Sequence, residues 1–280
     1  MQDPRLYQIA VLASLLTYGI YGLSFEFEPI PAFVMLATAL ATEAIGAKWR
    51  GQRFDPRSPL ISALSLCLLL RADGWPIYAG VAALTVASKY LIRWKGKHVF
   101  NPTNLGLVVA LLASDRVWVS AGQWGSAAWL ALLLAGVGQL VVRRAERADV
   151  TWAFLSSFTA LTFGRALWLG DPLTIPIHAL QNGALLIFAF FMLSDPRTTP
   201  ASRTGRVVFA LLVACGGFAV QYGLHRPNGL IGSLALFAMC VPLLDRWLPG
   251  NTFQWPGYKE RSDVEMDWRG ASLGTGVARG

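Results

Sequence analysis

The sequence predicts an all-α integral membrane protein with about ten transmembrane helices. Hydrophobic residues make up 54% of the 280 residues and charged residues only 14%, and the mean hydropathy is +0.46. Apolar runs follow one another with gaps of a few residues, which leaves no room for a second folded domain. Eleven tryptophans, many near the ends of these runs, are typical of an interfacial aromatic belt. Together these observations argue against a soluble enzyme.

Ten apolar runs are predicted to cross the bilayer, each judged against the roughly 20 residues that a crossing needs. The third and fifth runs are short, and short segments are tolerated where they line a cavity or pack against protein. We expect one transmembrane domain over residues 1–250 and a polar, largely disordered cytoplasmic tail over residues 251–280. The ten runs are residues 7–24, 29–46, 58–71, 74–93, 103–115, 122–142, 150–169, 173–193, 206–223 and 229–247.

Basic residues are concentrated in every second loop, which places them on one side of the membrane. Of the 24 Lys and Arg, 19 fall on one side, while Arg71, Arg116, Arg165 and Arg226 fall on the other and Lys89 lies within the fourth run. Because positively charged loops stay inside, we predict that both termini are cytoplasmic in an inner (plasma) membrane protein. The basic residues form no single face, so nucleic acid is not an expected partner.

Two short similarities raise the question of an internal repeat. The stretch that begins at Gly106 resembles the stretch that begins at Gly205, and Asp55-Pro56-Arg57 resembles Asp195-Pro196-Arg197. Duplication and chance similarity between apolar runs both account for this. If the chain is duplicated, two halves of five helices must be inverted relative to each other, a plan that places a site near the midplane.

The first candidate site is the stretch from His98 to Gly106, which runs into the short fifth helix. Asn101 suits a helix cap and Pro102 the first helical position, so one interpretation is simply a helix start. The sharper interpretation is that the positive helix end, with Thr103 and Asn104, faces a polar ligand inside the protein.

The second candidate site closes the eighth predicted helix. Asp195-Pro196 followed by Thr198 and Thr199 is ordinary turn chemistry, yet Asp195 directly follows a long apolar run. Polar side chains within the apolar runs form a third set, and such groups tend to face the bundle interior. They are Glu43, Lys89, Gln139, His178, Gln181, Asn182 and Asp245.

Some members of this third set have plainer explanations. We expect Lys89 to extend its amine to the cytoplasmic interface and Asp245 to lie near a helix end beside Arg246. Glu43 is either functional or paired with another helix, and Gln181 and Asn182 either bind a ligand or join helices. The three cysteines are expected to be buried free thiols. No catalytic residues or metal ligands are assigned, because no zinc spacing, P-loop, dinucleotide fingerprint or nucleophile elbow occurs.

Three stretches resemble the NqrB/RnfD family, the membrane flavin subunits of the sodium-pumping quinone reductase and of the Rnf electron-transport complex. The first is Phe100-Asn101-Pro102 with Gly106. The second runs from Asn182 to Asp195-Pro196 with Thr199, Pro200 and Gly205, and the third is residues 241–245. The order of these stretches and the ten-helix layout agree over most of residues 1–250.

The resemblance implies an inverted-repeat bundle that holds flavin (riboflavin or FMN) and passes electrons between other membrane or peripheral redox subunits. Quinone and movement of Na⁺ or H⁺ are implied as further partners. Family members with covalent FMN attach it to a Thr in an SGAT-like motif, which this sequence lacks. Noncovalent flavin is therefore the expectation, with Asn101, Asn182 and Asp195 in the loops that shape the binding region.

The leading hypothesis is thus a redox subunit that relays electrons, without necessarily catalysing a reaction itself. A channel or transporter for an ion or small solute would use the same bundle and its polar midplane residues. A membrane anchor for a partner enzyme is the third alternative. Flavin absorbance separates the first hypothesis from the other two.

Overall fold

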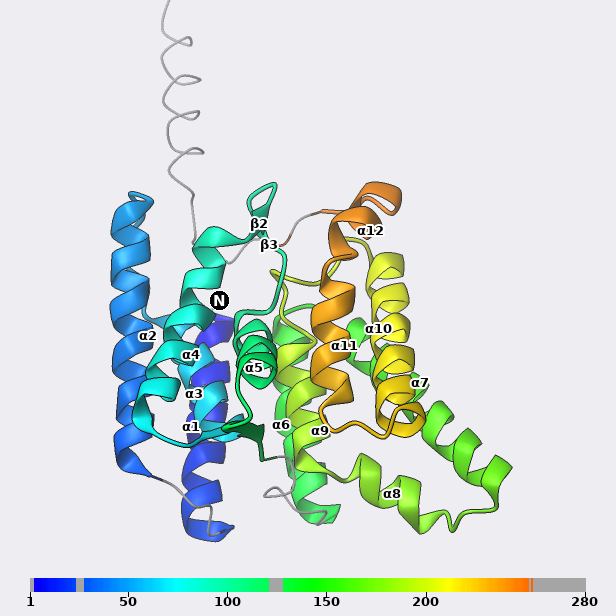
Figure 1. Cartoon of the computed structure of the whole chain (residues 1–280). Helices are drawn as coiled ribbons and strands as arrows, with labels where there is room; N and C mark the ends of the chain where they lie inside the picture. Colours follow the sequence, from blue (N-terminus) through cyan, green and yellow to red (C-terminus); the bar gives the residue numbers. More distant parts are fainter. Residues whose placement is uncertain (1–2, 24–27, 121–127, 252, 254–280) are drawn as a thin grey trace, which may run out of the picture.

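The computed structural model describes residues 3–23, 28–120, 128–251 and 253, and these are mostly helical (Figure 1). The N-terminal helices are α1 (Pro4–Gly22), α2 (Pro29–Trp49), α3 (Arg57–Leu69), α4 (Trp75–Leu91) and α5 (Pro102–Ala113). The later segments are α6 (Ala128–Arg144), α7 (Ala148–Leu169), α8 (Thr174–Leu180), α9 (Gly183–Ile187), η2 (Phe188–Met192), α10 (Arg203–Phe218), η3 (Ala219–Gly223), α11 (Gly229–Ala238) and α12 (Val241–Trp247). Short strands are β1 (Leu70–Ala72), β2 (Arg93–Trp94), β3 (Lys97–His98) and β4 (Val117–Val119).

The ten predicted apolar runs correspond in order to a single helix or to consecutive helical segments. Within the described residues, α2 and the continuous α10–η3 are long and apolar enough to span a membrane. Two bent pairs raise that number to four if each is one span: α8 with α9–η2, bent by 48°, and α11 with α12, bent by 50°. The helices α3 and α5 have only 13 and 12 residues, as predicted. The number of ten crossings stays a prediction, and most of the predicted tail and residues 122–127 lie outside the described chain.

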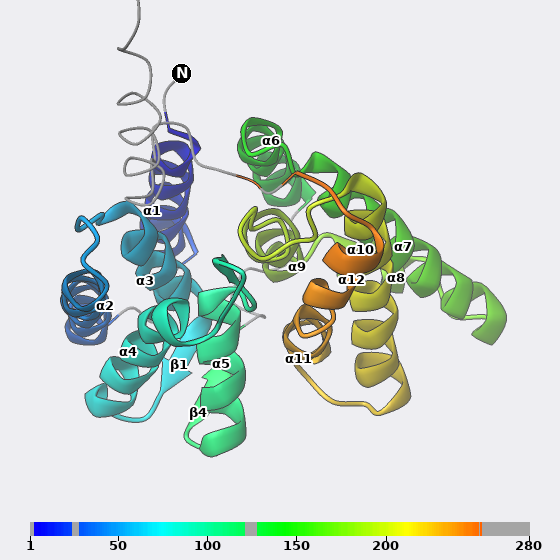
Figure 2. The ribbon, with the colours of Figure 1, turned by 90° about the horizontal axis from the view of Figure 1, so that it is seen from above.

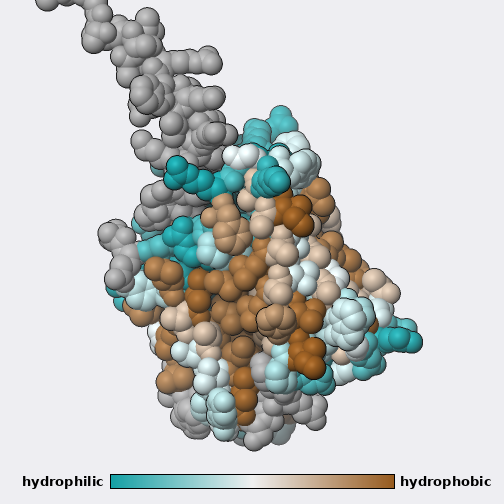
Figure 3. Space-filling view, turned by 90° about the vertical axis from the view of Figure 1, so that its left-hand side faces the viewer, coloured by the Kyte–Doolittle hydropathy of each residue, from teal (hydrophilic) through white to brown (hydrophobic). Residues whose placement is uncertain are grey.

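Large apolar side chains are exposed on the outer helices, as expected of a chain surrounded by lipid. On α2, Ile30, Phe33 and Ile45 are each about 70% exposed (70%, 72% and 71%). A broad hydrophobic band covers the face on the left of Figure 1, with hydrophilic residues gathered above it (Figure 3). Exposed tryptophans lie near helix ends, among them Trp49, Trp75 and Trp247. This distribution is that of a membrane protein of apolar helices.

The helices form two groups that pack side by side (Figure 2). In the first group α2 packs on α4, α4 on α5, and α1 on α3. In the second, α7 packs on α10, α10 on α11, and α6 on α9. The two groups meet where α5 contacts α11 and where α1 contacts α6. The same order of neighbours therefore occurs in both halves of the chain.

Glycine allows two of these helix contacts to be close. A Cβ atom on Gly46 of α2 would overlap the ring of Tyr90 on α4, and one on Gly106 of α5 would overlap the Thr85 hydroxyl of α4. Small residues at a helix interface let two backbones approach, which is a common way to pack helices in membranes. α4 is thereby held tightly between α2 and α5.

The two ends of the bundle differ. At the lower end of Figure 1, β1 pairs antiparallel with β4 and closes the segments that follow α3 and α5. At the upper end, β2 and β3 form a hairpin, and α2, α4 and α12 also finish at this end. We call this upper end, which carries Arg50, Arg93, Lys97 and Arg246, the basic end. α1 and α5 begin below the level at which α2 and α4 finish (Figure 1).

The helix α9 continues into the π-helical turn η2. The π-helical pattern, in which an N–H donates to the carbonyl five residues back, is shown by the bond from Leu193 N to Phe188 O at 2.9 Å. All five residues of η2 are buried. The turn ends at Leu193, immediately before Ser194 and Asp195.

Candidate functional site

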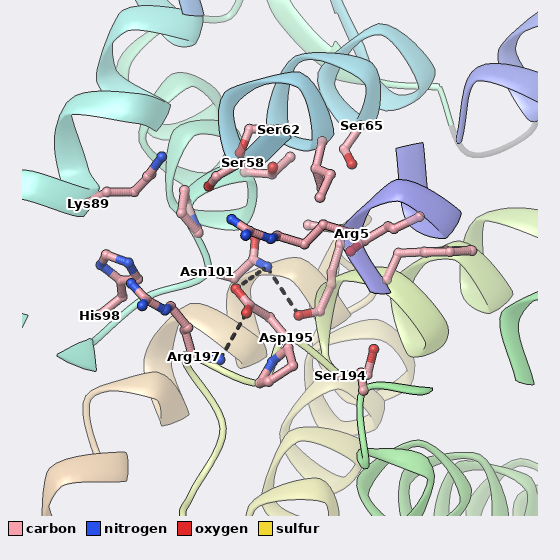
Figure 4. A pocket seen from close by; sticks show the side chains of 18 of the residues that line it. Arg5, Ser58, Ser62, Ser65, Lys89, His98, Asn101, Ser194, Asp195 and Arg197 are labelled. Carbon is pink, nitrogen blue, oxygen red and sulfur yellow. Dashed lines mark hydrogen bonds between the residues drawn. The ribbon is translucent and has the colours of Figure 1, made fainter. Parts of the chain in front are cut away.

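A pocket lies at the basic end, where four chain segments that are distant in sequence meet (Figure 4). The starts of α1, α3 and α5 contribute Arg5, Ser58 and Asn101, and the turn after η2 contributes Asp195. Side chains of α2, α4, α6 and the β2–β3 hairpin also line it. The empty space is about 1300 Å³ when the open mouth is included. The two loops that the sequence singled out therefore border one pocket.

Asn101 joins these two loops. Its Oδ1 accepts a bond from Asn104 N at 3.0 Å and so caps α5. Its Nδ2 donates to Met192 O and to Asp195 Oδ2, both at 3.3 Å. One amide thus satisfies the start of α5 and ties it to a turn 94 residues away. The predicted capping function is confirmed, and the link to Asp195 is additional.

Asp195 organises the turn after η2. Its Oδ1 accepts from Arg197 N at 3.0 Å, and its backbone oxygen accepts from the hydroxyls of Thr198 and Thr199 at 3.3 and 3.1 Å. Burial raises the pKa of the Asp195 carboxyl above its ordinary value, against the opposing effects of the Arg197 amide and of the Arg197 and Arg147 charges. Arg147 Nε also donates to Thr199 Oγ1 at 3.0 Å, which fixes the turn against α7.

Four charged residues connect the start of α1 to the start of α3. Arg5 contacts Asp3 at 2.6 Å and Asp55 at 2.7 Å, and Arg57 contacts the same two carboxylates at 2.6 and 2.7 Å. Burial acts to raise the pKa of Asp55, but bonds from Arg57 and the charges of Arg5 and Arg57 outweigh it, so that pKa lies below its ordinary value. The alternating charges hold one wall of the pocket.

Glu43 and Lys89 form a second charged contact, between α2 and α4. Lys89 Nζ lies 2.6 Å from Glu43 Oε2, and the side chains are only 7% and 8% exposed. The expectation that Lys89 extends to the interface is wrong, because a carboxylate within reach inside the bundle satisfies its amine. Of the two roles left open for Glu43, the structure contains the interhelical pairing.

His98 lies at the end of the β2–β3 hairpin and lines the pocket. Its pKa lies well below the ordinary value, first because the imidazole is buried and then because Arg197, Lys89 and Arg93 are close. The backbone of Lys89 hydrogen-bonds the ring. The stretch that begins at His98 was a candidate, but the sequence assigned no role to His98 itself, because the helix-start pattern is carried by Asn101 and Pro102.

Three serines of α3 also line the pocket, and sequence reasoning missed them. Ser58, Ser62 and Ser65 are spaced by four and three residues, so they share one face of the helix. That spacing within an apolar run is a signal that the sequence does carry. Apolar side chains complete the lining, namely Ile61, Val141, Phe190, Phe191 and Met192.

The remaining predicted site residues divide into two groups. Pro102 and Thr103 line the pocket with Asn101 and Asp195. Asn104, Asn182, Thr198 and Thr199 do not. Asn104 donates to Ile231 O of α11 at 3.1 Å, and Asn182 caps α9 by accepting from Ala184 N at 2.8 Å.

Other polar residues of the apolar runs make structural contacts. Gln139 accepts from Trp152 Nε1 at 2.8 Å, while His178 is exposed and Gln181 half-buried. Asp245 does lie on the last short helix, but it binds Lys97 at 2.8 Å and accepts from Ala201 N at 2.7 Å. Of the cysteines, only Cys67 is fully buried; Cys215 is exposed and Cys240 intermediate, so the expectation of three buried thiols is wrong for those two.

Comparison with known proteins points to one family. The model of the NQR2, RnfD, RnfE family matches residues 115–254, which is half of the chain and includes the Asp195 turn. A protein from Alcanivorax borkumensis, named as the D subunit of an ion-translocating oxidoreductase complex, is 24% identical over 284 aligned residues, covering 77% of this chain and 82% of its own length.

Two further relatives carry the same name. The one from Cellvibrio japonicus is 27% identical over 259 residues, covering 88% of this chain and 66% of its own length. The one from Haemophilus influenzae is 30% identical over 114 residues, covering 41% and 32%. The chain thus spans slightly less than two thirds of the second relative and about a third of the third. With half of its length matched by the family model, the chain belongs to the NQR2, RnfD, RnfE family.

Proposed function

We propose that this chain is an RnfD-like membrane component of an ion-translocating oxidoreductase complex, which holds flavin noncovalently in the basic-end pocket and relays electrons between partner redox subunits. The observation that carries the proposal is the Asn101–Asp195 contact, which brings the two family-like loops to one pocket. The family membership and the names of the relatives support the same conclusion. Coupling to Na⁺ or H⁺ movement and exchange with quinone belong to this proposal.

The lining of the pocket suits a flavin. An isoalloxazine ring needs apolar surface for its faces and hydrogen-bonding groups for its carbonyls and ring nitrogens. Phe191 and Met192 supply apolar surface, while Asn101, Thr103 and the α3 serines supply hydroxyl and amide groups. Bound flavin would supply one- and two-electron transfer, and the protein would supply orientation and exclusion of water.

Noncovalent attachment is favoured by the burial of the threonines. Thr151, in the stretch nearest to the missing SGAT-like motif, is 0% exposed and donates to Ala189 O at 3.1 Å. Thr198 and Thr199 are 5% and 1% exposed, and their hydroxyls are used within the turn. We therefore assign Asn101, Pro102, Thr103 and Asp195 to the flavin site. Asn104, Asn182, Thr198 and Thr199 would support the surrounding loops.

We further propose ten membrane crossings with a 5+5 inverted repeat and with the basic end in the cytoplasm. The support is that α1 to α5 and α6 to α11 have the same order of packing neighbours. The two short sequence similarities do not supply this support. Gly106 lies in α5 and Gly205 in the first turn of α10, while Asp55 precedes α3 and Asp195 follows η2.

The proposal is tested by the absorbance spectrum of the purified full-length protein. We expect a flavin spectrum that is released by acid, together with near-complete loss of flavin in Asn101→Ala. Asn182→Ala is the matched control, because both asparagines cap a helix but only Asn101 lines the pocket. Colourless protein from flavin-replete cells contradicts the proposal, as does equal flavin loss in the two variants.

A further inference from the structure

The His98 imidazole offers an unused polar atom to the pocket. The residue is only 9% exposed, and its side chain lies among the pocket residues beside Arg197 (Figure 4). Its Nδ1 atom is buried and has no hydrogen-bond partner among the described residues. A buried polar atom without a partner costs free energy, so its presence beside a pocket calls for a ligand group.

Whether His98 Nδ1 is a donor or an acceptor follows from the bond that the other ring nitrogen makes. The bond between the ring and the Lys89 backbone favours the protonated imidazole, so the ring is the donor in it. Since Nδ1 is the atom without a partner, that bond uses Nε2. A neutral imidazole carries one N–H only, so Nδ1 retains a lone pair and is an acceptor.

The charges that act on this imidazole are cationic. They are those of Arg197 on the turn after η2, Lys89 of α4 and Arg93 of β2. The acidic residues that line the pocket are Glu43, paired with Lys89, Asp55, paired with Arg5 and Arg57, and Asp195, bound to Asn101. The chain therefore presents one acceptor flanked by groups that can only donate.

We infer that His98 recognises an imide edge, in which one N–H lies between two carbonyls. The N–H would donate to His98 Nδ1, and the carbonyls would accept from the flanking cationic donors. The pyrimidinedione ring of a flavin has this edge, so the inference rests on the proposed function and makes His98 a specificity-determining residue for it. A ligand without that N–H would leave Nδ1 unpaired.

The test compares riboflavin with 3-methylriboflavin, in which a methyl group replaces the imide hydrogen so that the nitrogen cannot donate. Both are titrated into purified, flavin-depleted full-length protein and followed by flavin fluorescence. We expect the wild type to bind riboflavin about tenfold more tightly, the ratio typical of one buried hydrogen bond. The His98→Phe variant should bind both flavins with equal affinity. His178→Phe is the matched control, because that histidine is exposed and outside the pocket.

Acidification provides a readout that needs no substitution. Protonation turns Nδ1 into a donor, so the preference for riboflavin should persist at neutral pH and decline only below the ordinary imidazole value of 6.5. Equal binding of the two flavins by the wild type overturns the inference alone, as does a preference retained by His98→Phe. Failure of the wild type to bind either flavin overturns the proposed function and this inference together.

Discussion

The two ends of the bundle are closed by different means. At the end opposite the pocket, backbone groups pair in the β1–β4 ribbon, and Asp73 N donates to Arg116 O at 3.0 Å. The basic end is joined instead by side chains that connect distant segments, such as Asn101 with Asp195 and Arg5 with Asp55. Backbone pairing leaves few polar groups that could recognise a ligand. Side chains placed around an open space can recognise one. Because the basic end is held by long-range polar contacts, their loss should be costly.

The strongest test of this difference removes a buried charge. Glu43→Gln leaves Lys89 in the bundle without its counter-charge, and we expect the free energy of unfolding to fall by about 3–5 kcal/mol. Unfolding by SDS from mixed micelles, followed by circular dichroism, measures it. The matched control is Asp171→Asn, which breaks the Arg165–Asp171 pair, whose side chains are 31% and 32% exposed. That change should cost about 0–1 kcal/mol.

The reason for the large effect can also be checked. Replacing both partners, as in Glu43→Leu with Lys89→Met, removes the uncompensated charge and should recover most of the lost stability. Similar costs for Glu43→Gln and Asp171→Asn would show that the two ends tolerate charge removal equally. The proposed contrast would then be wrong.

A smaller effect is expected from the two asparagine caps. Asn101→Ala removes a cap and the link to the η2 turn, so it should cost about 2 kcal/mol, at the upper end of the range for caps. Asn182→Ala removes a cap alone and should cost about 1 kcal/mol. The same micelle unfolding assay measures both. The Asp195→Asn substitution should lower the free energy of unfolding less in the Asn101→Ala background than in the wild type, because the effects of residues in contact are not additive. That result would sharpen the contrast between the two asparagines.

The smallest effect concerns pH. The pKa values of Asp3 and Asp55 both lie below their ordinary value of 3.8. Their charged forms therefore stabilise the folded state; this contribution is complete above 3.8 and is lost as the pH falls through the lower, folded values. We expect the melting temperature to drop as the pH falls from about 4 to about 2, and to drop less in Asp55→Asn. If the melting temperature of Asp55→Asn falls as steeply with pH as that of the wild type, the Asp3–Asp55 cluster does not cause the loss of stability in acid.

The sequence predicted the helical segments well and the contacts between them poorly. Hydropathy and the prolines at the starts of α2 and α5 locate those helices, because both act within a few residues of chain. Helix rotation decides whether Glu43 meets Lys89 and whether Asp245 meets Lys97, and rotation depends on packing that local patterns do not contain. The bends within the eighth and tenth runs were missed for the same reason. Asn101 and Asp195 were found because a helix cap and an acidic residue after an apolar run are local patterns, and because their loops resemble a family. His98 and the α3 serines are not part of the family-like stretches.

The π-helical turn η2 has a consequence for how the Asp195 side chain is aimed. A π turn contains one more residue than an α-helical turn of the same height, and each residue rotates an α-helix by about 100°. The wider turn accommodates this extra residue, and it thereby sets the direction in which the chain leaves the helix. Deleting one residue from Phe188–Met192 would return the segment to ordinary α-helix and leave the direction of Asp195 nearly unchanged. If all five residues were kept and wound as α-helix instead, Ser194 and Asp195 would turn by about 100° about the helix axis. The bundle could then remain packed while the carboxylate faced away from Asn101, which would separate the making of the membrane scaffold from the making of its binding site.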